Sequence, residues 1–77
     1  MKLIISSVDT KHCDGEAKTL TLPGSEGELT VLSHHAPLIT TLKQGTLRVK
    51  KEDDSVEEFA IESGILEVSE NEATVLL

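Results

Sequence analysis

The chain has 77 residues, 38% of them hydrophobic and only one aromatic, and its formal net charge at pH 7 is −7. A chain of this length forms one domain, over residues 1–77, whose core must be built from Leu, Ile and Val. The negative charge argues against nucleic acid or anionic lipid as the main partner, because both are polyanions that bind clustered Lys and Arg. A basic or neutral protein partner fits this composition better.

The single cysteine, Cys13, cannot form a disulfide within the chain, and we interpret it as a small packed residue rather than a nucleophile. The N-terminal apolar run is too short for a signal peptide, and no stretch reaches the roughly 20 apolar residues of a membrane span. We therefore expect a cytoplasmic protein that reaches a membrane only by docking on an embedded partner.

Short strands separated by turns are predicted in the N-terminal third. A strand over residues 3–8 is followed by a turn over residues 9–11 and a short extended piece through Cys13. A tight hairpin bend is then expected at Asp14-Gly15, a dipeptide favoured in two-residue loops. Residues 16–22 alternate between apolar and polar side chains, which is typical of a strand with one face on a core. Pro23-Gly24 predicts the turn that ends this strand, because proline fixes φ and glycine accepts a positive φ.

The middle of the chain continues this pattern. Residues 28–32 are rich in β-branched and aliphatic side chains and predict a strand, followed by an ordered loop over residues 33–37. Residues 38–42 are expected to be extended, because Gly45 would cut short any helix. Residues 45–50 show the clearest alternation of apolar and polar side chains and predict a strand with one solvent-exposed face.

The C-terminal third is expected to contain three more strands. Residues 51–55 form a charged hairpin loop without the ligand spacing of a calcium site. Residues 56–61 predict a strand with a bulge or register change near Glu57-Glu58. The last two strands cover residues 65–68 and 73–77. Many short strands with turns between them and no amphipathic helix indicate a β-sandwich or small barrel.

Candidate chemistry is weak throughout the chain. His34 and His35 are adjacent, so in an extended segment they point to opposite sides, and neither they nor His12 have metal ligands at a recognised spacing. Glu26 and Glu28 would need a buried cleft to work as an acid–base pair, and a chain this small has little room for one. No catalytic residue, metal or cofactor is predicted.

Four segments together resemble a known family. In order and spacing, residues 24–29 (Gly-Ser-Glu-Gly-Glu-Leu), residues 35–38 (His-Ala-Pro-Leu), Gly45 and residues 64–68 (Gly-Ile-Leu-Glu-Val) resemble the N-terminal domain of the epsilon subunit of rotary, F-type ATP synthases. The likeness covers nearly the whole chain. It implies an all-β fold, a flattened sandwich of two antiparallel sheets with about ten short strands.

The resemblance also implies a function and a set of contact residues. The epsilon subunit is non-catalytic: it turns with the gamma subunit as the central stalk and seats that stalk on the ring of c subunits, which couples proton flow to ATP synthesis. Positions matching Glu26, Gly27 and Glu28 would contact the c-ring, and positions matching His35 and Thr40 would contact gamma. The expected location is the cytoplasmic face of the inner membrane, as a peripheral part of the synthase.

Three departures and one alternative accompany this interpretation. His34 and Ser63 stand where the family commonly has glycine, so the shape of both loops is open. Family members usually continue into a helical domain, whereas this chain stops at Leu77, so no inhibitory or nucleotide-sensing role is expected of it. The alternative function is a free-standing β-sandwich module that binds a small ligand or peptide, which would require a deep apolar pocket.

Overall fold

The computed structural model describes residues 1–77, which form nine strands joined by short connections. The strands are β1 (Lys2–Ser6), β2 (Lys11–Glu16), β3 (Thr19–Gly24), β4 (Gly27–Leu32), β5 (Leu38–Leu42), β6 (Gly45–Lys50), β7 (Val56–Ile61), β8 (Gly64–Ser69) and β9 (Glu72–Leu76). The predicted all-β fold is therefore confirmed.

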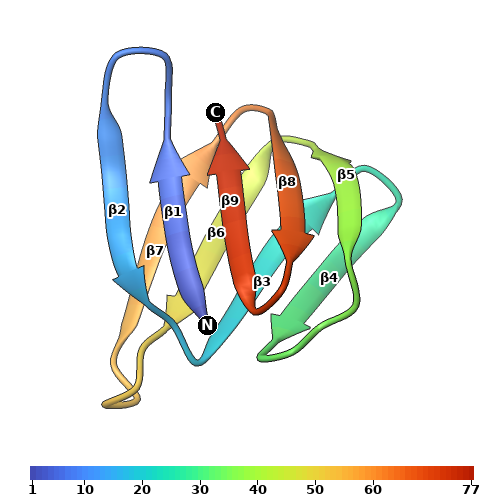
Figure 1. Ribbon diagram of the computed structural model, residues 1–77. Coiled ribbons are helices and arrows are strands. Elements are labelled where there is room, and N and C mark those ends of the chain that lie inside the picture. The colour runs from blue at the N-terminus through green and yellow to red at the C-terminus, as the bar shows by residue number, and fades with distance from the viewer.

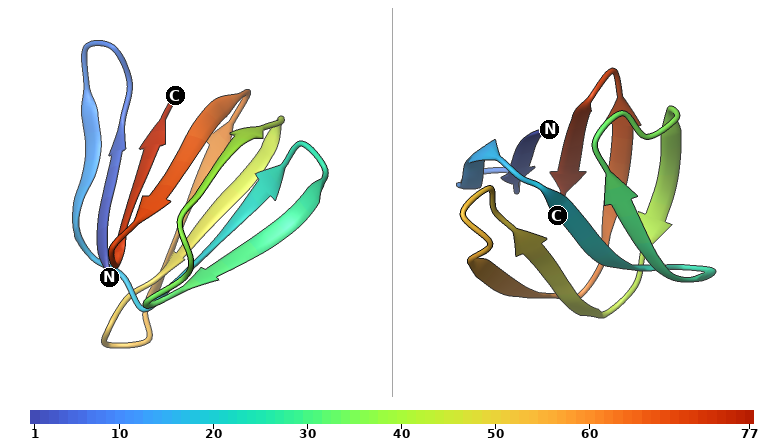
Figure 2. Two further views of the ribbon diagram at one scale, coloured as in Figure 1. Left: turned by 45° about the vertical axis from the view of Figure 1, so that its right-hand side comes forward. Right: turned by 90° about the horizontal axis from the view of Figure 1, so that it is seen from below.

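Two layers of strands face each other (Figures 1 and 2). Sheet I has the order β2-β1-β9-β8-β5, and sheet II has the order β4-β3-β6-β7. The hydrogen-bonded path passes from one sheet to the other at a single residue pair, Gly24 with Leu42. The predicted sandwich is thus closed along the β3–β5 side, whereas the edge strands β2 and β7 do not pair with each other.

The core between the sheets is entirely aliphatic apart from Met1, and contains no buried polar or charged side chain. It follows the alternation visible in the sequence, because inward side chains occur at every second position of a strand. Leu20 and Leu22 of β3 and Leu47 and Val49 of β6 are fully buried. Phe59 is half-buried and packs at the edge of the core rather than in its centre.

The first hairpin differs from the prediction. The bend expected at Asp14-Gly15 is absent: both residues lie within β2, where Asp14 pairs with Ile4 and Gly15 with Leu3. The chain turns over residues 7–10, which overlap the turn expected over residues 9–11, and there the Ser7 N–H donates to the Thr10 carbonyl at 2.7 Å. The turn preference of an Asp-Gly dipeptide is local, and continuous pairing with the buried strand β1 outweighs it.

Two smaller expectations also need correction. No bulge occurs near Glu57-Glu58, because β6 and β7 pair without interruption from Gly45–Ile61 to Lys50–Val56. Val56 simply points to the outer face, where it is exposed. The one irregular register lies between Ile5 and Ser6 of β1.

One strand pair is parallel. β1 runs alongside β9 from Lys2–Glu72 to Ser6–Leu76, so that the first and last strands are neighbours within sheet I. Parallel neighbours need a long connection, and here the rest of the chain supplies it. The N-terminal amino group also donates to the Ala17 carbonyl at 2.9 Å, which fixes the start of β1 against the connection between β2 and β3.

Candidate functional site

A tight hairpin between β3 and β4 carries the predicted acidic residues. Gly24 pairs with Gly27, so the turn consists of Ser25 and Glu26, two residues later than the sequence indicated. Gly27 has φ = +134°, a conformation that L side chains rarely adopt. A Cβ atom at Gly24 would lie 2.7 Å from the Gly27 carbonyl oxygen. Both glycines are therefore required by the shape of this acidic corner, defined here as residues 24–28.

The acidic corner is fastened to β5 of the opposite sheet. The Ser25 N–H donates to the Thr41 carbonyl at 3.0 Å, and the Lys43 N–H donates to the Pro23 carbonyl at 2.9 Å. The hydroxyl oxygens of Ser25 and Thr41 are 2.6 Å apart. Backbone bonds on both sides of the turn limit its movement, so the backbone of the corner is held in a fixed position.

Glu26 and Glu28 are exposed at this corner, and neither forms an ion pair. Glu28 lines a partly open depression of about 360 Å³ on the outer face of sheet II. No hydrophobic residue lines this depression, and it is the only pocket in the molecule. An enclosed apolar site for a small ligand is not present.

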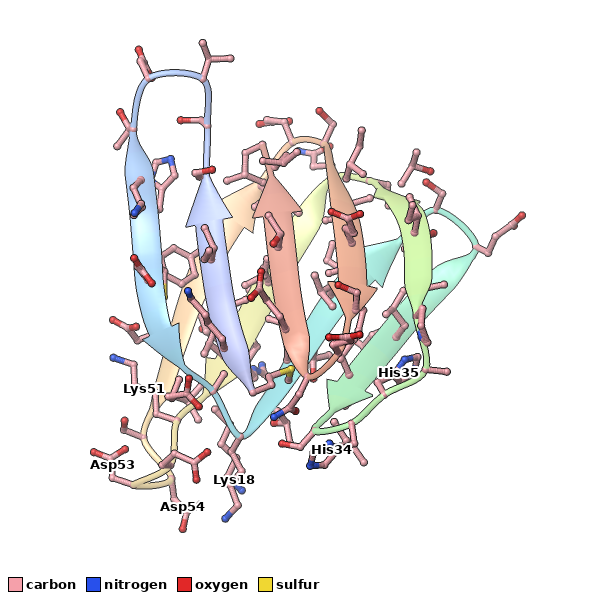
Figure 3. All side chains as sticks on the ribbon, in the orientation of Figure 1. Lys18, His34, His35, Lys51, Asp53 and Asp54 are labelled. Atoms are coloured by element: carbon pink, nitrogen blue, oxygen red, sulfur yellow. The ribbon has the colours of Figure 1, made fainter.

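The loop between β4 and β5 holds the two adjacent histidines (Figure 3). His34 has φ = +63°, and its N–H donates to the Asn71 side-chain oxygen at 3.0 Å. This left-handed conformation is one that glycine adopts more readily than a residue with a Cβ atom. The half-buried His35 donates its N–H to the Leu32 carbonyl at 3.2 Å, and its Nδ1 donates to the Ala36 carbonyl at 2.7 Å.

Thr40 lies in the middle of β5, opposite Leu66 of β8. It is half-buried because it shares the inward side of the strand with Leu42, whereas Ile39 and Thr41 point outward. The His34-His35 loop precedes β5, and the acidic corner is fastened to the opposite end of the same strand. The length of β5 therefore separates His35 from the acidic corner, whereas Thr40 lies next to Thr41, to which the corner is bonded.

Sequence reasoning missed an apolar patch on the outer face of sheet I. Ile39, Ile65 and Leu76 are 71%, 46% and 52% exposed, and they come from the adjacent strands β5, β8 and β9. Ile65 is directly opposite Leu76 in the β8–β9 register. The signal was the adjacent pair Ile65-Leu66, since a strand with apolar residues on both faces has a second apolar surface to cover.

The remaining reactive side chains do not form a site. His12 contacts the Ser7 hydroxyl at 3.2 Å, and no three His, Cys, Asp or Glu side chains are grouped to hold a metal ion. Burial raises the pKa of the Cys13 thiol, with a further contribution from the Glu57 carboxylate, so this thiol is not activated. No helix in this structure has the length and apolar character needed to cross a membrane.

Comparison with known proteins adds relatives of both sequence and fold. The epsilon chain of the Sulfurimonas denitrificans ATP synthase is 44% identical over 77 residues, which are all of this chain and 59% of that protein. This chain thus spans about three fifths of the length of that curated relative.

Two solved structures share the fold. A chain of the Euglena gracilis mitochondrial ATP synthase, solved with OSCP, F1 and c-ring, superposes with a TM-score of 0.91 at 24% identity, over 96% of this chain and 48% of that one. A chain of the Tetrahymena thermophila central stalk and c-ring gives 0.81 at 12% identity, over 97% and 60% of the two chains. The family described as "ATP synthase, Delta/Epsilon chain, beta-sandwich domain" matches residues 1–77, and the chain belongs to that family.

Proposed function

We propose that this chain is a non-catalytic rotor subunit of a proton-translocating ATP synthase, in which it binds gamma and seats the central stalk on the ring of c subunits. The observation that carries the proposal is 44% identity to an ATP synthase epsilon chain along the whole of this chain. Its place is peripheral, on the cytoplasmic face of the inner membrane, where it touches the membrane only through the ring.

The ring contact is assigned to Glu26, Gly27 and Glu28. Both carboxylates are exposed and have no ion-pair partner within the chain, so they are available to a neighbouring protein. Charge-assisted hydrogen bonds are stronger than neutral ones and favour one orientation of the partner. Gly27 contributes the backbone shape that presents the two carboxylates.

The gamma contact is assigned to His35 and Thr40, together with the apolar patch of Ile39, Ile65 and Leu76. Thr40 is only partly accessible, whereas its neighbour Ile39 points fully outward. Exposed aliphatic side chains from three adjacent strands are typical of a surface that a partner covers. The patch therefore supplies most of the apolar area of this contact.

The arrangement suits a mechanical role. β5 pairs with β8 along all five of its residues, and it connects the loop of His35, before its first residue, with the acidic corner at its last residues. A fully hydrogen-bonded strand within a packed sandwich deforms less than a free loop or an isolated hairpin. Torque applied at the gamma contact would thus reach the ring contact through the sheet.

The alternative function, a free-standing module for a small ligand or peptide, has less support. It requires a deep apolar pocket, and the one depression in the molecule is partly open and has no hydrophobic lining. No catalytic role is proposed, because no titratable group lies in an enclosed cleft.

The test is reconstitution with gamma and the remaining synthase subunits. The double variant His35→Ala/Thr40→Ala should reduce co-purification with gamma, because it removes both assigned side chains. Glu28→Ala should weaken seating on the ring by roughly five- to tenfold and leave gamma binding unchanged. Proton pumping per ATP hydrolysed measures the coupling.

The matched control is Glu52→Ala, which removes an exposed and unpaired carboxylate from the loop between β6 and β7. It should behave like the unmodified protein in both assays. If the variants at Glu28, His35 and Thr40 also remain assembled and coupled, the assigned contact residues are wrong.

A further inference from the structure

The depression beside the acidic corner contains charges of both signs. Seven residues line it: Thr21, Pro23, Glu28, Lys43, Gly45, Thr46 and Arg48. They come from β3, β4 and β6 and from the connection between β5 and β6, so the depression lies where the two sheets meet. A polar surface of this composition attracts a polar partner rather than an apolar one.

Pro23 contacts the backbone of the two residues that carry the charges, Glu28 and Lys43. Glu28 is directly opposite Pro23 in the β3–β4 register, and the Lys43 N–H donates to the Pro23 carbonyl at 2.9 Å. Gly45 packs closely against Pro23, since a Cβ atom at Gly45 would lie 2.9 Å from the Pro23 Cβ. The backbones that carry Glu28 and Lys43 are therefore both anchored to one rigid residue.

The two cationic side chains of the depression, Arg48 and Lys43, differ in whether a carboxylate of this chain already binds them. The Arg48 side chain binds the Glu58 carboxylate at 2.9 Å, so its charge is already compensated. Lys43 forms no ion pair with Glu28 or with any other carboxylate. Glu28 and Lys43 thus line the same depression as two unneutralised, opposite charges.

We propose that this depression seats a polar turn of the partner, with Glu28 binding a cationic or amide group and Lys43 binding a carboxylate of that turn. The inference rests on the proposed function, because the partner in question is the c-ring, and it adds Lys43 as a residue that determines orientation. A partner turned end for end would place like charges together, and such juxtaposition is strongly unfavourable.

The test measures binding of the purified complex of this chain with gamma to c-rings reconstituted in neutral phosphatidylcholine vesicles. Lys43→Gln should weaken binding about two- to fivefold at low ionic strength, and the difference should shrink as salt is added. Lys43→Arg keeps the positive charge and should bind like the unmodified chain.

Gln44→Glu is the matched control, because it changes the net charge by the same amount at the adjacent exposed residue, which does not line the depression. It should leave binding unchanged. If Lys43→Gln binds as well as Gln44→Glu while Glu28→Ala binds more weakly, the role of Lys43 is wrong and the proposed function stands. If the unmodified complex binds vesicles with and without c-rings equally, the proposed function fails, and this inference fails with it.

Discussion

The outer faces of the two sheets differ in chemistry although their inner faces are alike. Sheet II exposes a polar surface, including the Arg48–Glu58 ion pair and the paired hydroxyls of Thr21 and Thr30. Sheet I exposes the apolar patch of Ile39, Ile65 and Leu76. The core is complete without this patch, so the fold does not explain its apolar character. The proposed contact with gamma on sheet I would account for it.

The largest expected effect comes from replacing the apolar patch on sheet I with polar side chains, so that the outer faces of both sheets become polar. The triple variant Ile39→Ser/Ile65→Ser/Leu76→Ser should lower gamma affinity by about 100-fold, on the order of 3 kcal/mol, because each change removes roughly 1 kcal/mol of apolar burial. Isothermal titration calorimetry with purified gamma measures this change. The free energy of unfolding should fall less than it would for three core residues, because these side chains are already 46% to 71% exposed in the folded chain.

The control for the patch is on the other sheet. Leu32 and Val56 are 56% and 50% exposed on sheet II, so the double variant Leu32→Ser/Val56→Ser removes comparable side chains outside the patch. Gamma affinity should be unchanged in this variant. Equal losses in the two variants would show that the difference between the faces has no role in binding.

The second largest effect is expected at the acidic corner, where the two sheets meet. Gly24→Ala should lower the free energy of unfolding by about 2 kcal/mol, because the new Cβ would press on the Gly27 carbonyl oxygen and on Leu29. Gly15→Ala is the matched change in an exposed strand position with no atom within 4 Å, and it should be neutral or stabilising by up to about 1 kcal/mol. Urea unfolding followed by circular dichroism compares them. Equal stability of the two variants would contradict the steric argument.

The smallest effect is expected from surface charges at the end of sheet II. Lys18 binds Asp54 at 2.9 Å, between the loop that joins β6 to β7 and the connection that precedes β3 (Figure 3). The hydrogen bond and the positive charge of Lys18 lower the pKa of Asp54, and Asp54 raises the pKa of Lys18.

The sign of the pH dependence follows from these directions. Because the folded chain holds Asp54 deprotonated more strongly than the unfolded chain does, its contribution is present above the ordinary aspartate pKa of about 3.9 and is lost as the pH falls through the lower folded value. The Lys18 contribution is present below about pH 10.4 and is lost as the pH rises through the higher folded value.

Asp54→Asn should therefore reduce the loss of stability on acidification only slightly, because both groups are exposed and screened by solvent. Urea midpoints at pH 7 and at about pH 3 measure the difference. A variant whose acid dependence is steeper than that of the unmodified chain would contradict the assigned direction.

Local patterns predicted most of the strands correctly. The alternation of Leu20 with Leu22 and of Leu47 with Val49 identified which side chains are buried, because the period of a strand depends only on its backbone. The resemblance carried by the segments around Glu28 and His35 identified the family, which the match over residues 1–77 confirms. The roles of individual contact residues stay predictions.

Errors arose where distant segments decide the outcome. The Asp14-Gly15 dipeptide was predicted to turn, but pairing with β1 keeps it in a strand. The contact role of Thr40 stays a prediction, and the sequence did not show that this residue shares the inward side of β5 with Leu42. Lys43 was not singled out, because its proximity to Glu28 depends on the junction between the two sheets.

The sequence by itself determined the strand content, the aliphatic core and the presence of a glycine-containing turn near the acidic residues. Each of these follows from local properties, namely the alternation of apolar side chains along a strand and the turn preference of glycine. Only the tertiary structure decided that β1 lies parallel to β9, that Gly24 meets Leu42, and that three strands combine their exposed side chains into one apolar patch. The reason is that strand pairing depends on packing between segments far apart in the chain, which no local pattern specifies.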